Sequence, residues 1–269
     1  MQKNKLTALW SSGQPILNGW CSIGNSFTAE IMAAQGYDSV TVDIQHGALD
    51  YSDVLPMFQA MQSSGATLMA RVPWRDPGYI MKALDVGAMG IICPMINNSE
   101  EAAEFISYMR YPPLGQRSFG PTRVAVSVPD YGVEANDEVL AFAMIETADG
   151  VQNLEAIAAT AGLDGIYVGP ADLTLGTQLG RLAPGLDRTE DEMVTLIQKV
   201  ASVCKEYGLI AGIHCGTAEY ASKAIGWGYN LTTIGGDTRL LASAAAASVS
   251  SWRKLTGRKE KAQVTGGVY

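Results

Sequence analysis

The sequence predicts an α/β fold, a (β/α)8 TIM barrel, on three observations. Short apolar, strand-like runs alternate with amphipathic, helix-like segments along almost the whole chain, and eight such strands can be counted. The chain has 269 residues, close to the roughly 250 that are usual for this barrel. An open, doubly wound sheet is the alternative, but the glycine-rich turn of its dinucleotide-binding form and the P-loop are both missing from the sequence.

Each predicted strand is a short run of mostly apolar or β-branched residues. The predicted strands cover residues 17–22, 39–43, 66–72, 89–94, 140–145, 164–169, 209–214 and 230–234. The segments between them predict helices over residues 26–35, 51–63, 78–86, 99–110, 146–159, 190–207, 217–225 and 238–254. Helix ends are marked as well. Gly36 can close the first helix, and Ser99 opens the fourth as an N-cap, with Glu100 and Glu101 at the positive end of the macrodipole.

The connection over residues 111–138 is too long for an ordinary turn of such a barrel. Its stretch 115–123 predicts an ordered functional loop or lid, although the segment could also contain a further short strand. We expect residues 1–256 to form a single barrel domain. The last stretch, residues 257–269, is polar and contains glycine, and we expect it to be a mobile tail.

Composition indicates a well-packed protein, with 47% hydrophobic and 17% charged residues. The net charge of −8 argues against a nucleic-acid partner, because phosphate binding needs a basic face. No segment has the pattern of a membrane span or a signal peptide. The four cysteines form no CxxC pair, which favours buried thiols in a reducing compartment over disulfides or a zinc site. We therefore expect a cytoplasmic protein.

Residues capable of chemistry follow directly after several predicted strands. A parallel barrel directs the carboxyl ends of its strands to one face, where such barrels carry their active sites. The sequence therefore predicts one site that combines acids, a histidine and a guanidinium. Its members are Trp20, Asp43 with His46, Arg71, Glu146, and Asp172 in the turn over residues 169–173.

Glu146 and Asp172 follow consecutive predicted strands, so their carboxylates could approach one ion. Two hard oxygen ligands leave most of an octahedron to water and substrate, which suits Mg²⁺ or Mn²⁺, with Co²⁺ and Zn²⁺ as alternatives. Each acid also has a simpler interpretation. Glu146 could interact with the macrodipole of the helix that follows it, and Asp172 could be a helix N-cap.

His46 is one of only two histidines. Asp43 precedes it across the strand end and is placed to accept a ring N–H and fix the tautomer. We expect the two residues to act together in acid–base chemistry. His214 also ends a strand but has no evident acid partner, and we expect it either to line the site or to be structural.

Arg71 ends its strand where a buried cation needs an anion, which a substrate carboxylate or enolate would supply. An ion pair with Asp43 or Glu146 is the alternative. No lysine falls at a strand end, which excludes a Schiff-base mechanism. The glycine and the backbone N–H groups of the turn over residues 169–173 predict an anion-binding nest.

The motifs around these residues resemble those of the HpcH/HpaI family of class II pyruvate aldolases, over nearly the whole chain. The motifs are Trp20, VDIQHG (42–47), ARVP (70–73), LDVGA (84–88), CPM (93–95), RYPP (110–113) with Gly115 and Arg117, IET (145–147), Asp164-Gly165, VGPADL (168–173), and GDT (236–238) before Leu240 and Leu241. Several such blocks in the same order are a specific signal.

This resemblance implies a metal-dependent barrel that reversibly cleaves 4-hydroxy-2-oxo acids to an aldehyde and pyruvate, or a close analogue such as hydroxypyruvate. It also implies a homohexamer in which the last helix is exchanged between subunits. Roles for single residues follow from the same resemblance. They are metal ligands at Glu146 and Asp172, an enolate-stabilising cation at Arg71, an acid–base pair at His46 and Asp43, substrate contacts from Trp20, Gly169, Pro170, Ala171 and Asp172, and at Asp85 an acid that approaches the site of a neighbouring subunit.

The chain departs from the family pattern in two places. Many members have an acid before the histidine, where this chain has Gln45, and many have glutamine two residues before the metal-binding glutamate, where it has Met144. Met144 removes a polar contact near pyruvate, so the preferred nucleophile or aldehyde can differ. We expect the aldehyde pocket to be drawn from Trp20, Arg117, Phe119, His214 and residues at the boundary between subunits.

Two other functions remain open from the sequence. A lyase of the related malyl/citramalyl-CoA type would share the barrel and the acidic metal pair, but few arginines or lysines lie near the expected mouth to hold CoA phosphates. A non-catalytic barrel that binds 2-oxo acids is the second alternative. The full set of polar strand ends counts against it.

Overall fold

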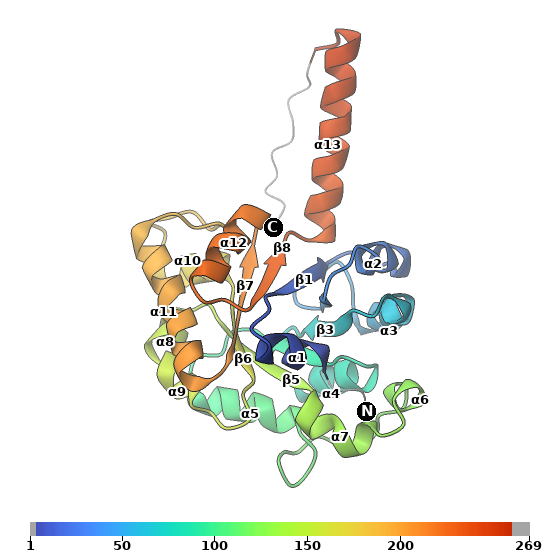
Figure 1. The fold of residues 1–269 in the computed structure, drawn as a ribbon, viewed down its shortest axis with the longest axis vertical. Coiled ribbons are helices and arrows are strands. Elements are labelled where there is room, and N and C mark those ends of the chain that lie inside the picture. The colour runs from blue at the N-terminus through green and yellow to red at the C-terminus, as the bar shows by residue number, and fades with distance from the viewer. Residues whose placement is uncertain (1–3, 260–269) are drawn as a thin grey trace.

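The computed structural model describes residues 4–259 as a closed barrel of eight parallel strands, with helices around it (Figure 1). The strand order follows the sequence, and the last strand pairs with the first, so the predicted (β/α)8 barrel is confirmed. The strands are β1 (Ile16–Cys21), β2 (Ser39–Asp43), β3 (Thr67–Arg71), β4 (Gly90–Cys93), β5 (Leu140–Ile145), β6 (Gly165–Val168), β7 (Ile210–Cys215) and β8 (Leu231–Ile234).

The principal helices follow the strands along the chain, as predicted. They are α2 (Ser26–Ala33), α3 (Tyr51–Met61) with a short 3-10 turn (Gln62–Ser64), α4 (Pro77–Asp85), α5 (Ser99–Met109), α8 (Ala148–Gln152), α9 (Leu154–Ala158), α11 (Asp191–Tyr207), α12 (Ala218–Gly226) and α13 (Asp237–Thr256). Side-chain caps fix several helix starts. Asn25 accepts hydrogen bonds from the first turn of α2, Asn98 rather than Ser99 caps α5, and Asp50 and Asp53 form a capping box at α3.

Four helices were not anticipated from the sequence: α1 (Lys5–Ser11), α6 (Val124–Ser127), α7 (Tyr131–Glu138) and α10 (Pro170–Gln178). The long connection over residues 111–138 contains α6 and α7 and no further strand. The single helix expected over residues 146–159 is two helices, because the chain turns at Asn153. Of the expected tail, Gly257 caps α13 in the left-handed conformation, whereas residues 260–269 lie outside the described part of the chain.

Large apolar side chains fill the lower part of the barrel interior. Phe142 faces Gly165 on the next strand, and Tyr167 faces Gly212. A Cβ at Gly165 would lie 2.5 Å from the Phe142 ring, and one at Gly212 would lie 2.7 Å from the Tyr167 ring, so these glycines make room for the two rings. Leu6 of α1 is fully buried in the same cluster at the amino-terminal end. The interior is therefore packed toward the amino-terminal ends of the strands, and a cavity opens at their carboxyl ends.

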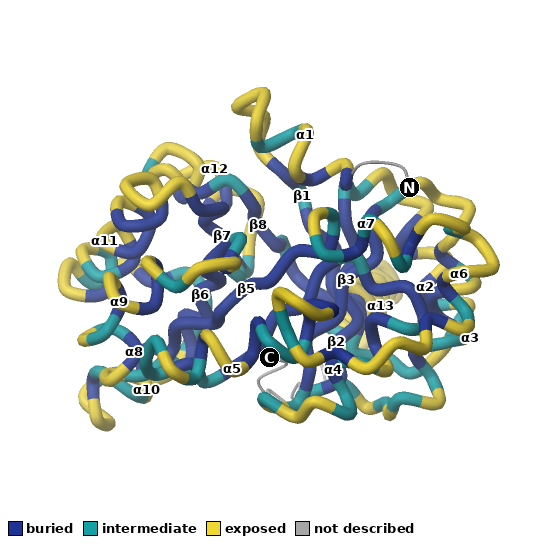
Figure 2. Tube along the Cα trace, turned by 90° about the horizontal axis from the view of Figure 1, so that it is seen from below, coloured by how far each residue is buried: buried dark blue, intermediate teal, exposed yellow. Residues whose placement is uncertain are grey.

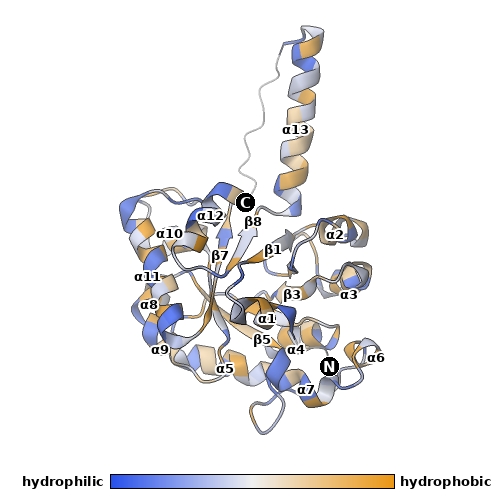
Figure 3. Ribbon diagram, in the orientation of Figure 1, coloured by the Kyte–Doolittle hydropathy of each residue, from blue (hydrophilic) through white to orange (hydrophobic). Residues whose placement is uncertain are grey.

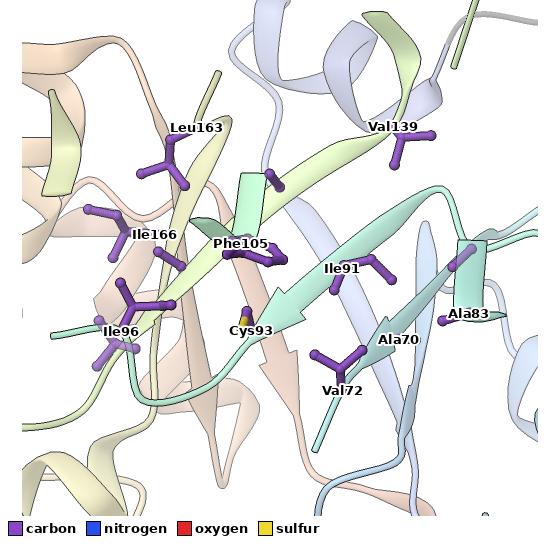
Figure 4. Packing of buried hydrophobic residues seen from close by; sticks show 14 of the residues in the cluster. Ala70, Val72, Ala83, Ile91, Cys93, Ile96, Phe105, Val139, Leu163 and Ile166 are labelled. Carbon is purple, nitrogen blue, oxygen red and sulfur yellow. The ribbon is translucent and has the colours of Figure 1, made fainter. Parts of the chain in front are cut away.

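A second, larger core lies between the strands and the surrounding helices. Figure 4 shows part of it, where Ile91 and Cys93 of β4 lie near Phe105 of α5. The strands are buried along their length, and exposure is confined mainly to the outer faces of helices and to loops (Figure 2). All four cysteines are free and buried, as expected. No helix within residues 4–259 is long and apolar enough to cross a membrane.

Helix α13 projects away from the barrel instead of packing along it (Figure 1). Only its first residue, Asp237, is buried. Apolar residues lie along the projecting part (Figure 3), and Leu241, Trp252 and Leu255 are 63%, 51% and 83% exposed. An apolar stripe of this length needs a covering surface that the barrel of the same chain does not provide.

Candidate active site

A cavity of about 250 Å³ opens at the carboxyl ends of the strands. The structure brings most of the predicted site residues to its wall. They are Trp20, Asp43, His46, Arg71, Gly169, Ala171 and Asp172. Met144, His214 and Thr238 also line it. The cavity is small and has several polar groups converging on it, as expected for a site that binds a small acid.

Asp43 and Arg71 form the centre of one wall. The parallel register of β2 and β3 pairs them directly. Arg71 donates from Nε to Asp43 Oδ1 at 2.8 Å and from Nη2 to Oδ2 at 2.6 Å, a bidentate and fully buried ion pair. Trp20 completes the arrangement, because its indole N–H donates to Oδ2 at 3.2 Å and its ring lies 4.8 Å from the guanidinium.

Electrostatics keep both partners of this pair charged. Burial raises the pKa of Asp43, but the charge and hydrogen bonds of Arg71 outweigh it and hold the pKa below its usual value. Burial alone would lower the pKa of Arg71, and Asp43 raises it above the usual value. No acceptor within residues 4–259 is bonded to Arg71 Nη1. Asp43 therefore fixes the guanidinium and leaves N–H donors for a ligand.

Asp43 also contacts the segment that carries His46. The backbone N–H of His46 donates to Asp43 Oδ1 at 3.3 Å, and the backbone N–H of Gln45 donates to the same oxygen at 3.2 Å. The acid–base pair of His46 and Asp43 stays a prediction. Asp43 thus holds the backbone after β2 while both its oxygens engage Arg71. The ion pair with Asp43, one of the two alternatives for Arg71, is present.

Glu146 lies directly after β5 and is 2% exposed. Its Oε1 accepts the backbone N–H of Met95 at 2.8 Å, and Met95 adopts a left-handed conformation with φ of 57°. Its Oε2 faces Gly169, where an added Cβ would lie 2.8 Å from that oxygen and 2.3 Å from Met144 Cε. Gly169 is thus the residue that lets the next strand approach this carboxylate.

Burial raises the pKa of Glu146 from 4.5 to about 7, and the negative charge of Asp172 acts in the same direction, against the opposing hydrogen bond from Met95. A buried carboxylate next to a second one is stabilised by a cation between or beside them. The two acids therefore have the chemistry of an oxygen donor pair for a divalent ion. No group of three or more His, Cys, Asp or Glu residues that could hold a metal occurs within residues 4–259.

The turn after β6 is the start of α10, with Gly169 as N-cap and Pro170 at the first helical position. No side chain caps this helix. The first turn of any helix leaves its N–H groups without intrahelical acceptors and carries the positive end of the macrodipole. Ala171 lies in that turn on the cavity wall, so the arrangement suits a carboxylate.

Other expected contributors lie away from the cavity of this chain. Asp85 ends α4 and accepts a hydrogen bond from Arg117 Nη2 at 2.7 Å. Arg117 is 1% exposed and packs on the rings of Tyr111 and Tyr131. Phe119 is 72% exposed. The expectation that Arg117 and Phe119 line an aldehyde pocket is wrong within this chain, because the long connection folds as a layer of its own on α4.

Sequence reasoning missed two residues that build the site. Met95 positions Glu146, and only the CPM motif after β4 pointed to that segment. Asp237 is 3% exposed and accepts the backbone N–H groups of Ser22 and Ile23 at 2.9 and 3.0 Å, which ties the start of α13 to the segment after β1. The GDT motif was the available signal for it. Both act through backbone geometry that a sequence does not display.

The raised pKa of Glu146 predicts a pH-dependent stability of the metal-free protein. Below the unfolded pKa of 4.5 the group is protonated in both states. Between 4.5 and about 7 the unfolded chain ionises first, so the free energy of unfolding falls as pH rises, by about 3 kcal/mol in all. The free energy of unfolding is measured by urea unfolding between pH 4.5 and 8, with a chelator present and the protein concentration fixed. In Glu146→Gln this fall should disappear, and an unchanged profile would contradict the assignment.

The comparisons with known proteins agree on one family. The family model described as HpcH/HpaI aldolase/citrate lyase matches residues 19–244. A hydroxypyruvate/pyruvate aldolase of Rhizorhabdus wittichii is 37% identical over 94% of this chain and all of the relative. A 4-hydroxy-2-oxo-heptane-1,7-dioate aldolase of Escherichia coli is 31% identical, over 91% of this chain and 93% of the relative. The crystal structure of an HpcH/HpaI aldolase/citrate lyase family protein from Burkholderia cenocepacia superposes with a TM-score of 0.85 at 30% identity, covering 93% of this chain and 100% of that one.

Proposed function

The chain belongs to the HpcH/HpaI aldolase/citrate lyase family and is an aldolase by homology, and we propose that it reversibly cleaves 4-hydroxy-2-oxo acids with a divalent metal ion. The products would be an aldehyde and pyruvate or hydroxypyruvate. The observation that carries the proposal is the buried Arg71–Asp43 pair in the same small cavity as the first turn of α10. A fixed guanidinium and a helix start together suit a substrate with two neighbouring anionic or electron-rich oxygens.

In this proposal the groups of the site divide the work of binding the substrate and stabilising its charge. The first turn of α10, at Ala171 and Asp172, binds the substrate carboxylate. Glu146 and Asp172 would hold the divalent ion, which supplies Lewis-acid polarisation of the 2-keto oxygen when bound. Arg71 donates to the same keto oxygen, where negative charge develops. Asp43 keeps the guanidinium in position.

His46 moves the proton. It takes the proton of the C4 hydroxyl as the C3–C4 bond breaks. The C4 oxygen becomes the carbonyl of the departing aldehyde, and the electron pair of the broken bond passes to C3, forming the enolate that Arg71 stabilises. Return of the proton to C3 gives the free 2-oxo acid. The same steps in reverse form the carbon–carbon bond.

A substrate panel tests this function. Pyruvate and hydroxypyruvate are each combined with a series of aldehydes under Mg²⁺, Mn²⁺, Co²⁺ and Zn²⁺, and product formation is followed by chromatography. We expect aldol products with at least one pairing, lost on chelation. Acetyl-CoA with glyoxylate is the comparison arm. Product in that arm alone would overturn the proposal in favour of a CoA-thioester lyase, and no product in any arm would favour a non-catalytic binding barrel.

We further propose that α13 packs on a neighbouring subunit, in a homohexamer of the kind that the family resemblance implies. The support is its exposed apolar stripe, which runs through Leu241, Trp252 and Leu255. In that assembly Asp85 of one subunit would approach the cavity of another, which is compatible with its distance from the cavity of its own chain.

The double variant Leu241→Asp/Trp252→Asp should dissociate the assembly, because two buried charges in an apolar interface are strongly unfavourable. Light scattering after size exclusion should show the mass falling by at least half. Ala246→Asp adds a charge to the opposite side of the same helix and should keep the wild-type mass. A double variant with the wild-type mass would contradict the proposed packing.

A further inference from the structure

His214 is a polar side chain on the cavity wall that the proposed mechanism does not use. It lies near the end of β7, and its ring meets the Trp20 ring edge-on, with centroids 4.8 Å apart and an interplanar angle of 77°. Trp20 in turn lies against Arg71. The imidazole is therefore held beside the group that is to stabilise the enolate, and its partial exposure is toward the cavity.

A chain of hydrogen bonds inside the barrel leads to this ring. It begins at Asn18 of β1, whose Oδ1 accepts from Ser39 Oγ at 2.7 Å and from Thr41 Oγ1 at 3.1 Å. With both lone pairs of Oδ1 engaged, the amide nitrogen of Asn18 is the group that faces Thr233 of β8, and it donates to Thr233 Oγ1 at 2.9 Å.

The bond from Asn18 to Thr233 determines which group donates in the next two hydrogen bonds of the chain. Thr233 Oγ1 also contacts Tyr167 Oη at 2.7 Å, and no other acceptor for the Thr233 proton is found in residues 4–259. The threonine hydroxyl therefore donates to Tyr167 Oη. Burial raises the pKa of Tyr167 far above its usual value, so the phenol keeps its proton. With its oxygen accepting from Thr233, the phenol has its own proton left to donate to His214 Nδ1, which lies 3.3 Å away.

The chain of donors decides the tautomer of His214. Nδ1 is the acceptor from Tyr167, so a neutral ring carries its proton on Nε2. Burial lowers the pKa of His214 to about 3, and the charge of Arg71 acts in the same direction, so the ring is neutral at physiological pH. Because Nδ1 is turned to the buried Tyr167 and His214 lines the cavity, Nε2 is the ring nitrogen left for a ligand in the cavity. No hydrogen bond from Nε2 to another group is present in the described part of the chain.

We propose that His214 presents Nε2–H as a neutral hydrogen-bond donor to the cavity and selects substrates that carry a hydroxyl oxygen at that place. The inference rests on the proposed aldolase function and names a substrate feature for the same site. The oxygen would be either the C3 hydroxyl of a hydroxypyruvate nucleophile or a hydroxyl next to the aldehyde carbon. A neutral donor favours a hydroxyl over a hydrogen or methyl group at that position without attracting a second carboxylate as a cation would.

The tautomer is tested first, without reference to activity. The chain has only two histidines, so ¹⁵N–¹H correlation spectra of the imidazole rings contain two systems. One ring should show a protonated Nε2 and an unprotonated Nδ1 between pH 6 and 8. In Tyr167→Phe, which keeps the ring and removes the donor, the Nδ1 resonance of that ring should shift while the other ring is unchanged. A proton on Nδ1 of His214 would overturn the proposal.

Selectivity is tested with two replacements. His214→Leu should lower kcat/KM for hydroxyl-bearing substrates by about 10-fold relative to their deoxy partners. His214→Gln, whose amide can place a donor near the position of Nε2, should recover most of that selectivity. Hydroxypyruvate against pyruvate tests the nucleophile, and glycolaldehyde against acetaldehyde with pyruvate tests the aldehyde. An equal loss for all substrates in His214→Leu would mean a structural role and would contradict the proposal.

Activity and ligand binding distinguish the aldolase function from the donor role of His214. A wild-type protein without any aldol activity would count against the proposed function, and the donor would then be judged by binding alone. In that case hydroxypyruvate or glycolaldehyde, and not pyruvate or acetaldehyde, should shift the Nε2 resonance of His214 in the Mg²⁺-supplemented protein. No shift with any of these ligands would overturn the donor role.

Discussion

Replacing Arg71 with lysine should lower kcat for aldol cleavage on the order of 10²–10³-fold at saturating metal, the usual loss when one group that stabilises developing oxyanion charge is removed. The geometry gives the reason. Arg71 uses Nε and Nη2 to hold Asp43 and has further N–H donors for the substrate. A lysine ammonium is a point charge that cannot bind a carboxylate bidentately and present a fixed donor to the substrate as well.

Lysine is preferred to alanine at this position because Arg71→Ala would leave the buried Asp43 charge unpaired, which typically costs about 3–5 kcal/mol of stability. Release of 2-oxo acid is measured in a coupled assay, and the thermal midpoint is measured on the same samples. Arg75→Lys is the matched control, because Arg75 pairs with Glu101 and Glu104 away from the cavity. The control should keep wild-type kcat. A folded Arg71→Lys variant with wild-type kcat would contradict the proposed role of this guanidinium in stabilising the enolate.

Replacing Glu146 with glutamine should weaken binding of Mg²⁺ or Mn²⁺ strongly and reduce metal-dependent cleavage by at least about 10²-fold. Glutamine keeps the shape and an oxygen that can accept the N–H of Met95, so the change removes mainly the negative charge. Because that charge is buried beside Asp172, its removal also relieves repulsion in the metal-free protein. The variant is therefore expected to fold.

Isothermal titration of the metal-free protein with Mn²⁺ measures the binding arm of this prediction. Glu155→Gln, an exposed position on α9, is the control and should bind like wild type. If Glu146→Gln bound Mn²⁺ with wild-type affinity and cleaved substrate at the wild-type rate, the Glu146–Asp172 pair would not be the metal site.

The sequence was sufficient to predict the barrel and most of the residues on its cavity wall. The spacing of apolar residues indicates the strands, and the position of a polar residue directly after a strand indicates that it faces the cavity. Parallel strands bring their carboxyl ends to one face, so the order of strands along the chain is enough to group Asp43, Arg71 and Asp172. From the sequence, the ion pair between Asp43 and Arg71 was one of several alternatives, and nothing in the sequence chose among them. Its formation depends on the register of β2 with β3, which pairs the two residues directly.

What the sequence did not reveal depends on single backbone torsions and on packing between distant segments. The left-handed turn at Met95 aims an N–H at Glu146, and a sequence has no sign for such a turn at a methionine. Arg117 stood in a motif that suggested the substrate site. It is instead buried between Asp85 and two tyrosine rings, because residues 111–138 fold on α4 rather than over the cavity.

Exchange of the methyl protons of pyruvate with D₂O, followed by ¹H NMR, tests the central claim most directly, because it needs only enolate formation in this cavity and no knowledge of the aldehyde. We predict exchange with Mg²⁺ or Mn²⁺ present, loss of exchange on chelation, and a rate lower by about 10²-fold or more in Arg71→Lys. A wild-type protein that binds pyruvate with metal and leaves its methyl protons unexchanged, or a variant that exchanges them at the wild-type rate, would contradict the account.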